Sequence, residues 1–268
     1  MKNTTVFDED LNPVLELSDN SELEPLVGYL KGKYSEQLTD TDVYVKHSPN
    51  HEKYADLIAK ELRDMGGNSF ANAVRREGPK YHEIVCDVAS KLKAPYNKNK
   101  DVSEIENSIL ETILTKALDE MSTEDKEKLM KEMGGKSTLN LGGATTAAFI
   151  TLFKSGGFYS YQLTLIVANQ IARFILGKGL QFATNAAITR VAGILAGPVG
   201  WAISGLWTAV DIAGPAYKVT IPSVVHVAML RKKHNSLECS NCDAMFTDTT
   251  IRFCPECGHS IFESTDRN

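Results

Sequence analysis

Residues 103–121 read SEIENSILETILTKALDEM, and this stretch is the clearest indicator of the fold class. Its apolar side chains recur at helical spacing on one side, at Ile105, Ile109, Ile113, Ala117 and Met121. That spacing predicts an amphipathic α-helix with one buried face. We expect Ser103 and Glu106 to form the capping box that opens this helix.

The neighbouring stretches carry the same periodicity. Upstream, an apolar stripe runs through Tyr81, Ile84, Val85, Val88 and Leu92. Further upstream, residues 54–65 form a similar stripe, and Gly66 and Gly67 supply its stop. Downstream, Ser122 is expected to begin another helix. No run with a period of two interrupts these patterns, so the front of the chain is predicted to be all-α.

The overall composition is that of a globular protein. The chain has 268 residues, of which 43% are hydrophobic and 24% are charged, and this excludes a disordered protein. A net charge of −5 argues against a nucleic-acid coat protein but permits a local basic surface. The opening residues MKNTTVFDEDLN contain no apolar run, so we expect no secretory signal and a cytoplasmic location, with membrane association as the alternative.

Charge divides the chain into three segments. Residues 1–140 carry a net charge of −8, residues 141–230 of +4 and residues 231–268 of −1. We therefore expect three domains. They are an acidic all-α domain (1–138), an apolar Gly-rich helical region for assembly or membrane contact (139–234), and a small β zinc ribbon (235–268).

The middle segment contains long uncharged runs. Residues 191–210 have no charged side chain over 20 positions, about the length that a membrane-spanning helix needs. Gly197 and Pro198 interrupt this run at its centre, and Gly193 and Gly197 have the spacing that lets helices pack closely. We favour buried helices or a self-assembly surface that makes the protein a homo-oligomer. Insertion into a membrane is the alternative.

The tail carries the most specific chemical motif. Its cysteines form two Cys-x-x-Cys pairs, Cys239 with Cys242 and Cys254 with Cys257. Four thiolates at this spacing are typical of tetrahedral zinc, and four ligands leave no position open for catalysis. We expect one structural Zn²⁺ per chain, a positive φ at Gly258, and a hairpin between residues 244–247 and 251–253.

Residues 44–87 are the candidate catalytic region. Cleavage of RNA without a metal needs groups that transfer protons and a cation that contacts the phosphate. His82 and Glu83 are the candidates for proton transfer, and Arg75 is the candidate phosphate contact. The alternative is a polar network that only joins helices. The candidate RNA-binding residues lie near the zinc motif, at Arg231, Lys232, Lys233 and Arg252.

Two strings carry a family resemblance. The first is ELRDMGGNSFANAVR, residues 61–75, followed by YHEIVCDV, residues 81–88, and the second is DIAGPAYKVTIP, residues 211–222. They resemble the YaaW-like family of bacterial proteins, to which this chain adds a zinc ribbon. The combination is also similar to a ring-activated zinc-finger ribonuclease of anti-phage defence.

The resemblance implies one function and leaves two others open. It implies a single-chain defence effector that senses a phage structural or ring-shaped protein, oligomerises and cleaves RNA. The second hypothesis is a stress or defence effector whose apolar helices enter a membrane. The third is a non-catalytic zinc-ribbon adaptor or assembly chaperone.

Overall fold

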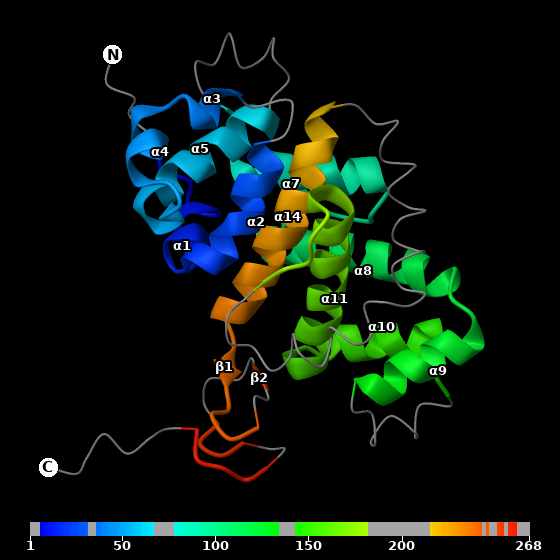
Figure 1. The fold of residues 1–268 in the computed structure, drawn as a ribbon. Coiled ribbons are helices and arrows are strands. Elements are labelled where there is room, and N and C mark those ends of the chain that lie inside the picture. The colour runs from blue at the N-terminus through cyan, green and yellow to red at the C-terminus, as the bar shows by residue number, and fades with distance from the viewer. Residues whose placement is uncertain are drawn as a thin grey trace, which may run out of the picture.

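The computed structural model describes residues 6–31, 36–66, 78–133, 143–181, 215–242, 245–246, 251–254 and 257–261. This part of the chain is mainly helical, with two short strands near its C-terminal end (Figure 1). The front holds α1 (Asn12–Glu16), α2 (Asn20–Leu30), α3 (Glu36–Thr39), α4 (Asp42–His47), the 3₁₀ turn η1 (His51–Tyr54), α5 (Ala55–Gly66), α7 (Tyr81–Leu92), α8 (Val102–Asp119) and α9 (Thr123–Glu132).

The remaining elements come from the middle and the tail. They are α10 (Thr146–Lys154), α11 (Gly157–Leu176), α14 (Pro215–His234), β1 (Leu237–Glu238) and β2 (Met245–Phe246). The all-α prediction for the front and the small β element in the tail are both confirmed. Gly193, Gly197 and the uncharged run 191–210 lie outside the described residues.

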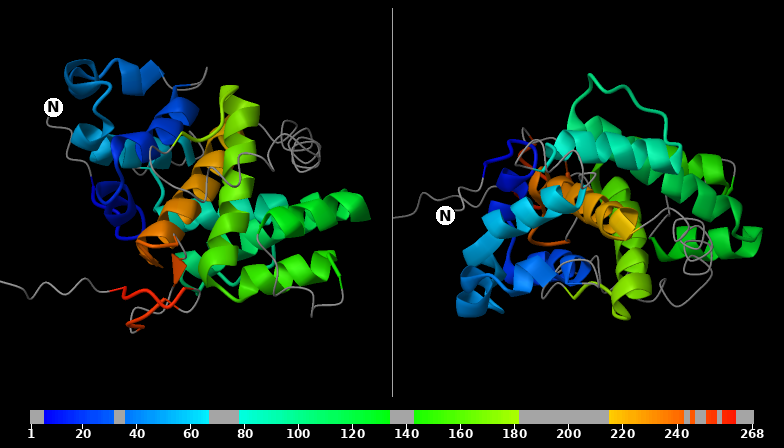
Figure 2. Two further views of the ribbon diagram at one scale, coloured as in Figure 1. Left: turned by 60° about the horizontal axis from the view of Figure 1, so that its bottom comes forward. Right: turned by 90° about the horizontal axis from the view of Figure 1, so that it is seen from above.

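Helix α14 is the centre of the fold. It packs against α1, α2, α5, α7, α8 and α11, and Figure 2 shows these helices around it from two more sides. Its apolar residues are fully buried from Val219 to Leu230. One continuous hydrophobic core therefore joins the front helices to α10, α11 and α14. The domain boundary at 138/139 stays a prediction, and the described helices on both sides of it share this core.

Local signals explain where the helices begin and end. Ser122 caps α9 as predicted, because its Oγ accepts a hydrogen bond from the backbone N–H of Asp125 at 3.1 Å. Helix α11 begins after Gly156 and ends at Gly177, whose φ of 70° suits a residue without a side chain. Within the described residues, no helix is both long and apolar enough to cross a membrane.

The capping box predicted at Ser103 and Glu106 is wrong. Helix α8 begins at Val102 with Asp101 at its N-cap, so Ser103 already lies within the helix. The Glu106 side chain does not return to the backbone. It faces Arg231 on α14, and that buried ion pair outweighs a local cap.

The described residues of the tail pair differently from the predicted hairpin. Met245 and Phe246 pair with β1 in an antiparallel register, Leu237 with Phe246 and Glu238 with Met245. Phe253 instead forms a bridge with Ser260. Within the described residues, β2 therefore pairs with the strand that precedes the first cysteine pair and not with residues 251–253.

Candidate metal centre and nucleic-acid interface

The four cysteines of the tail come together in one cluster. Their sulfur atoms all lie within 4.8 Å of one another. Cys239 Sγ is 3.6 Å from Cys257 Sγ, and Cys242 Sγ is 3.5 Å from Cys254 Sγ. A tetrahedral zinc with Zn–S bonds of about 2.3 Å separates its sulfurs by about 3.8 Å. The cluster therefore fits a four-coordinate metal, most naturally zinc.

The backbone around the second pair holds its cysteines in place. The N–H of Gly258 donates to the carbonyl of Cys254 at 2.8 Å, and the N–H of Cys254 donates to the carbonyl of His259 at 2.7 Å. Gly258 has a φ of 74°, which confirms the predicted positive value. The Asn241 side chain donates to Cys257 Sγ at 3.4 Å and, with the His259 backbone, lowers the pKa of this thiol to about 6. A thiolate is the form that binds metal.

The same turn displays an aromatic and a basic side chain. Phe253 is 64% exposed although it directly precedes the buried ligand Cys254. Arg252 and His259 are also exposed. The N–H of Ile261 donates to the carbonyl of Arg252 at 3.0 Å and fixes the backbone beneath these side chains. We call Arg252, Phe253 and His259 the ribbon tip.

The other three candidate RNA-binding residues already have partners inside the chain. Arg231 Nε donates to Glu106 at 2.8 Å, and its Nη2 donates to the same carboxylate at 3.3 Å and to the carbonyl of Asp10 at 2.5 Å. Lys233 forms an ion pair with Glu22. Lys232 donates to Ser160 Oγ at 3.1 Å. These contacts stabilise the packing of α14, and of the four candidates Arg252 alone is exposed.

Glu106 is the buried centre of a polar network. Its side chain is 2% exposed, and the Tyr81 hydroxyl donates to it at 2.9 Å. Burial raises the pKa of Glu106, while Arg231 and the Tyr81 hydroxyl act in the opposite direction. The sequence pattern indicated only a local role for Glu106, as part of a capping box. Its actual partner, Arg231, is 125 residues away along the chain. No short-range pattern signals such a pair.

The candidate catalytic residues do not converge within the described residues. His82 Nε2 lies 3.1 Å from the carbonyl of Lys100, to which it can donate. Glu83 lies on another side of α7 and lines a cavity together with Arg63 and Lys80. Successive helical residues point about 100° apart, which accounts for this separation. Arg75 lies outside the described residues.

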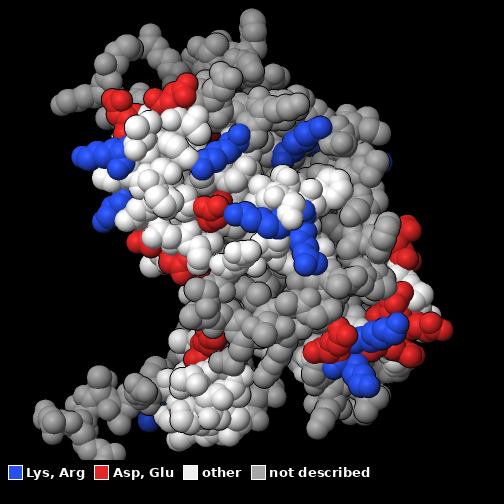
Figure 3. Space-filling model, in the orientation of Figure 1, with Lys and Arg blue, Asp and Glu red and all other residues white. Residues whose placement is uncertain are grey.

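His51 illustrates the alternative role of residues 44–87. It is 2% exposed, and its ring nitrogens contact Glu24 at 2.6 Å and the Tyr54 hydroxyl at 2.5 Å. It therefore joins α2 to η1 as part of a structural polar network. On the face drawn in Figure 3, Lys and Arg side chains are interspersed with Asp and Glu over the described helices. This mixed surface contrasts with the aromatic and basic ribbon tip.

The similarity to known proteins lies mainly in the helical part of the chain. A family model described as ubiquinol-cytochrome C chaperone matches residues 50–225. A UPF0174 protein of Helicobacter pylori strain J99 is 46% identical over 233 residues, which cover 85% of this chain and 92% of that protein. The UPF0174 protein YaaW of Escherichia coli K12 is 34% identical over 188 residues, 69% of this chain and 74% of that protein. No solved structure matches this chain.

Proposed function

The chain belongs to the UPF0174 family, and we propose that it is an RNA-acting effector whose zinc ribbon binds single-stranded RNA. The observation that carries the proposal is the exposed Phe253 beside the exposed Arg252, on a turn held by the four-cysteine cluster. Single exposed apolar side chains are common on protein surfaces, so the exposure of Phe253 supports recognition only together with the adjacent Arg252 and the turn that holds both.

The ribbon tip has the chemistry that single-stranded nucleic acid requires. An aromatic face stacks on any base, so it binds single strands with little sequence preference. A guanidinium contacts phosphate oxygens or stacks on a base in its own right. The metal would hold Cys254, and with it the neighbouring Phe253 and Arg252, in one orientation. This preorganisation reduces the entropy lost when RNA binds.

Cleavage and activation are the further steps of the proposal. We infer a homo-oligomer that assembles through residues 139–234 in response to a phage component and then cuts RNA. These steps rest on the resemblance of the sequence to a ring-activated zinc-finger ribonuclease. They do not rest on a cluster of catalytic side chains among the described residues. His82, Glu83 and Arg75 remain predictions for the cut, and His82 would have to leave the Lys100 carbonyl to accept a proton at Nε2.

RNA binding is tested by fluorescence anisotropy with a labelled unstructured RNA and zinc-loaded protein. Loss of one stacked base costs about 1–3 kcal/mol, so Phe253→Ala should weaken binding by about 5- to 150-fold. The matched control is Phe7→Ala, because Phe7 is 56% exposed but lies far from the tail in the sequence. Equal affinity of Phe253→Ala and the parent would overturn the proposed contact.

Cleavage is tested separately on the same RNA with protein mixed with lysate from phage-infected cells. Loss of cutting in His82→Ala and Arg75→Ala, with folding and RNA affinity retained, would support the assigned roles. Intact RNA under all conditions would refute the enzymatic step and leave the adaptor hypothesis. Dye release from liposomes by the parent would favour the membrane hypothesis instead.

A further inference from the structure

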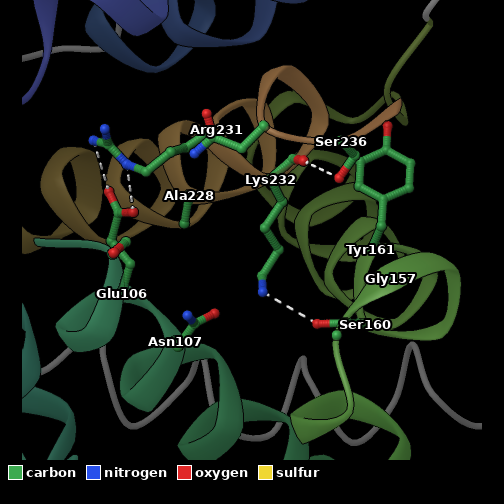
Figure 4. A pocket seen from close by; sticks show the side chains of 12 residues that line it. Glu106, Asn107, Gly157, Ser160, Tyr161, Ala228, Arg231, Lys232 and Ser236 are labelled. Carbon is green, nitrogen blue, oxygen red and sulfur yellow. Dashed lines mark hydrogen bonds and ion pairs between the residues drawn. The ribbon is translucent and has the colours of Figure 1, made fainter. Parts of the chain in front are cut away.

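A cavity of about 170 Å³ lies where α8, α11 and α14 meet, close to the start of the ribbon. Asn107 of α8, Ser160 of α11 and Lys232 of α14 contribute to its lining, and Ser236 lies at the edge next to β1. In Figure 4 the Asn107 amide and the Lys232 ammonium group are directed into the same space. Pockets for drug-sized ligands measure about 300–1,000 Å³, so this cavity suits only a small ligand.

The ammonium group of Lys232 is the main charge in this cavity. It donates to Ser160 Oγ at 3.1 Å and lies 4.9 Å from the centre of the Phe153 ring. Within the described residues it forms no ion pair with a carboxylate, and burial lowers its pKa to about 8. An ammonium has three N–H donors, so two remain after the bond to Ser160.

The nearest acid does not neutralise Lys232. Glu106 lines the same cavity, but its carboxylate binds the Arg231 guanidinium and the Tyr81 hydroxyl. Glu106 also attracts the Lys232 ammonium group and opposes the lowering of its pKa, but the charges of Glu106 and Arg231 sum to zero. The positive charge of Lys232 therefore remains as the net charge of the lining side chains.

Two neutral features add to the attraction for an anion. The first turn of α11 forms one wall, through Gly156 and Gly157. This turn has no side-chain cap and no acidic residue, so the partial positive charge of the helix N-terminus is not offset there. On the opposite wall, the Asn107 amide supplies N–H donors, and it has no hydrogen-bond partner among the described residues.

We propose that this cavity is a binding site for a small tetrahedral oxyanion such as inorganic phosphate or the phosphate group of a small monoester. The donors come from three helices and surround the space from different sides. That arrangement matches the four oxygens of a tetrahedral anion better than the two coplanar oxygens of a carboxylate. The site is distinct from the ribbon tip and uses none of its residues.

Isothermal titration of the zinc-loaded protein with inorganic phosphate tests the site. The parent should bind one phosphate per chain, and Lys232→Met should weaken binding at least tenfold. Methionine keeps the length of the buried stem, and urea unfolding of each variant checks that the fold is intact. Lys128→Met is the matched control, because Lys128 is 72% exposed on α9 and does not line the cavity. It should bind phosphate as the parent does.

Titrations of two further variants and of a second anion complete the test. Asn107→Leu should weaken phosphate binding several-fold while leaving Lys232 in place, and this variant keeps the test valid if Lys232→Met does not fold. Arg252→Gln should not change phosphate affinity, so failure of this site is distinguishable from failure of RNA binding at the ribbon tip. Phosphate affinity that is equal in the parent, Lys232→Met and Asn107→Leu would overturn the proposal. Acetate that binds as tightly as phosphate would overturn the choice of a tetrahedral anion.

Discussion

Removing the Arg231 side chain should destabilise the fold by a large and specific amount. Arg231→Met deletes two hydrogen bonds to Glu106 and one to the carbonyl of Asp10. It leaves a carboxylate that is 2% exposed with the Tyr81 hydroxyl as its remaining partner from this network. Breaking a buried ion pair by removing one partner costs about 3–5 kcal/mol. We expect the free energy of unfolding to fall by that amount.

A double-mutant cycle separates the pair from the packing of its side chains. Glu106→Leu alone should also be destabilising, because it leaves the largely buried guanidinium of Arg231 without its anion. In the Glu106→Leu/Arg231→Met protein neither charge is buried without a partner. The two single losses should therefore exceed the loss in the double variant by about 2 kcal/mol or more. The Tyr81 hydroxyl loses its acceptor in this protein, which accounts for part of the remaining loss.

Urea unfolding followed by circular dichroism measures these free energies. Fluorescence anisotropy with labelled RNA measures the RNA affinity of the same proteins. The structure predicts that folded Arg231→Met retains the RNA affinity of the parent. If Arg231→Met has the same urea unfolding midpoint as the parent but loses RNA affinity, the internal role of Arg231 is refuted. The RNA contact expected from the sequence would then be correct.

Three further predictions concern stability and metal. Purified protein should contain one zinc per chain by atomic absorption. Cys254→Ser or a strong chelator should release the zinc and unfold the tail. The helices should stay folded, because their hydrophobic core is separate from that of the tail. A helical signal that disappears together with the zinc would contradict this separation. Burial lowers the pKa of His226 to about 4 from an ordinary value of 6.5, so the unfolded chain binds the extra proton between these pH values. The contribution of His226 to the free energy of unfolding should therefore be constant above pH 6.5 and fall by about 3 kcal/mol towards pH 4. An unchanged decrease in His226→Gln would assign it to other groups. Gly78→Ala should cost about 1–3 kcal/mol, because its Cβ would lie 2.5 Å from the backbone carbon of Arg63; an unchanged urea midpoint would show that this contact relaxes freely.

The features that were predictable from the sequence are those encoded over a few residues. The spacing of Ile105, Ile109 and Ile113 reflects the helical period directly, and all three side chains are buried. Ser122 caps its own helix because the acceptor and the donor are three residues apart. The four cysteines were recognisable because zinc knuckles need a fixed spacing within each pair.

The features that were missed depend on contacts between distant parts of the chain. Glu106 satisfies the pattern of a capping box, but Arg231 stabilises it more strongly from α14. Likewise, a basic run such as 231–233 usually indicates a solvated surface, yet Arg231 and Lys233 here bind acids on α8 and α2. The strand pairing of the tail depends on β1, which lies before the first cysteine and outside the motif.

Mapping the RNA contact by ultraviolet cross-linking tests the central claim most directly. Zinc-loaded protein is irradiated with single-stranded RNA, digested, and analysed by mass spectrometry for peptides that carry a nucleotide. We expect that the main cross-linked peptide contains Phe253 and that Phe253→Ala removes it. Cross-links confined to residues 44–87, or to the segment 231–233, with no modified peptide from the ribbon tip, would contradict RNA binding at the zinc ribbon.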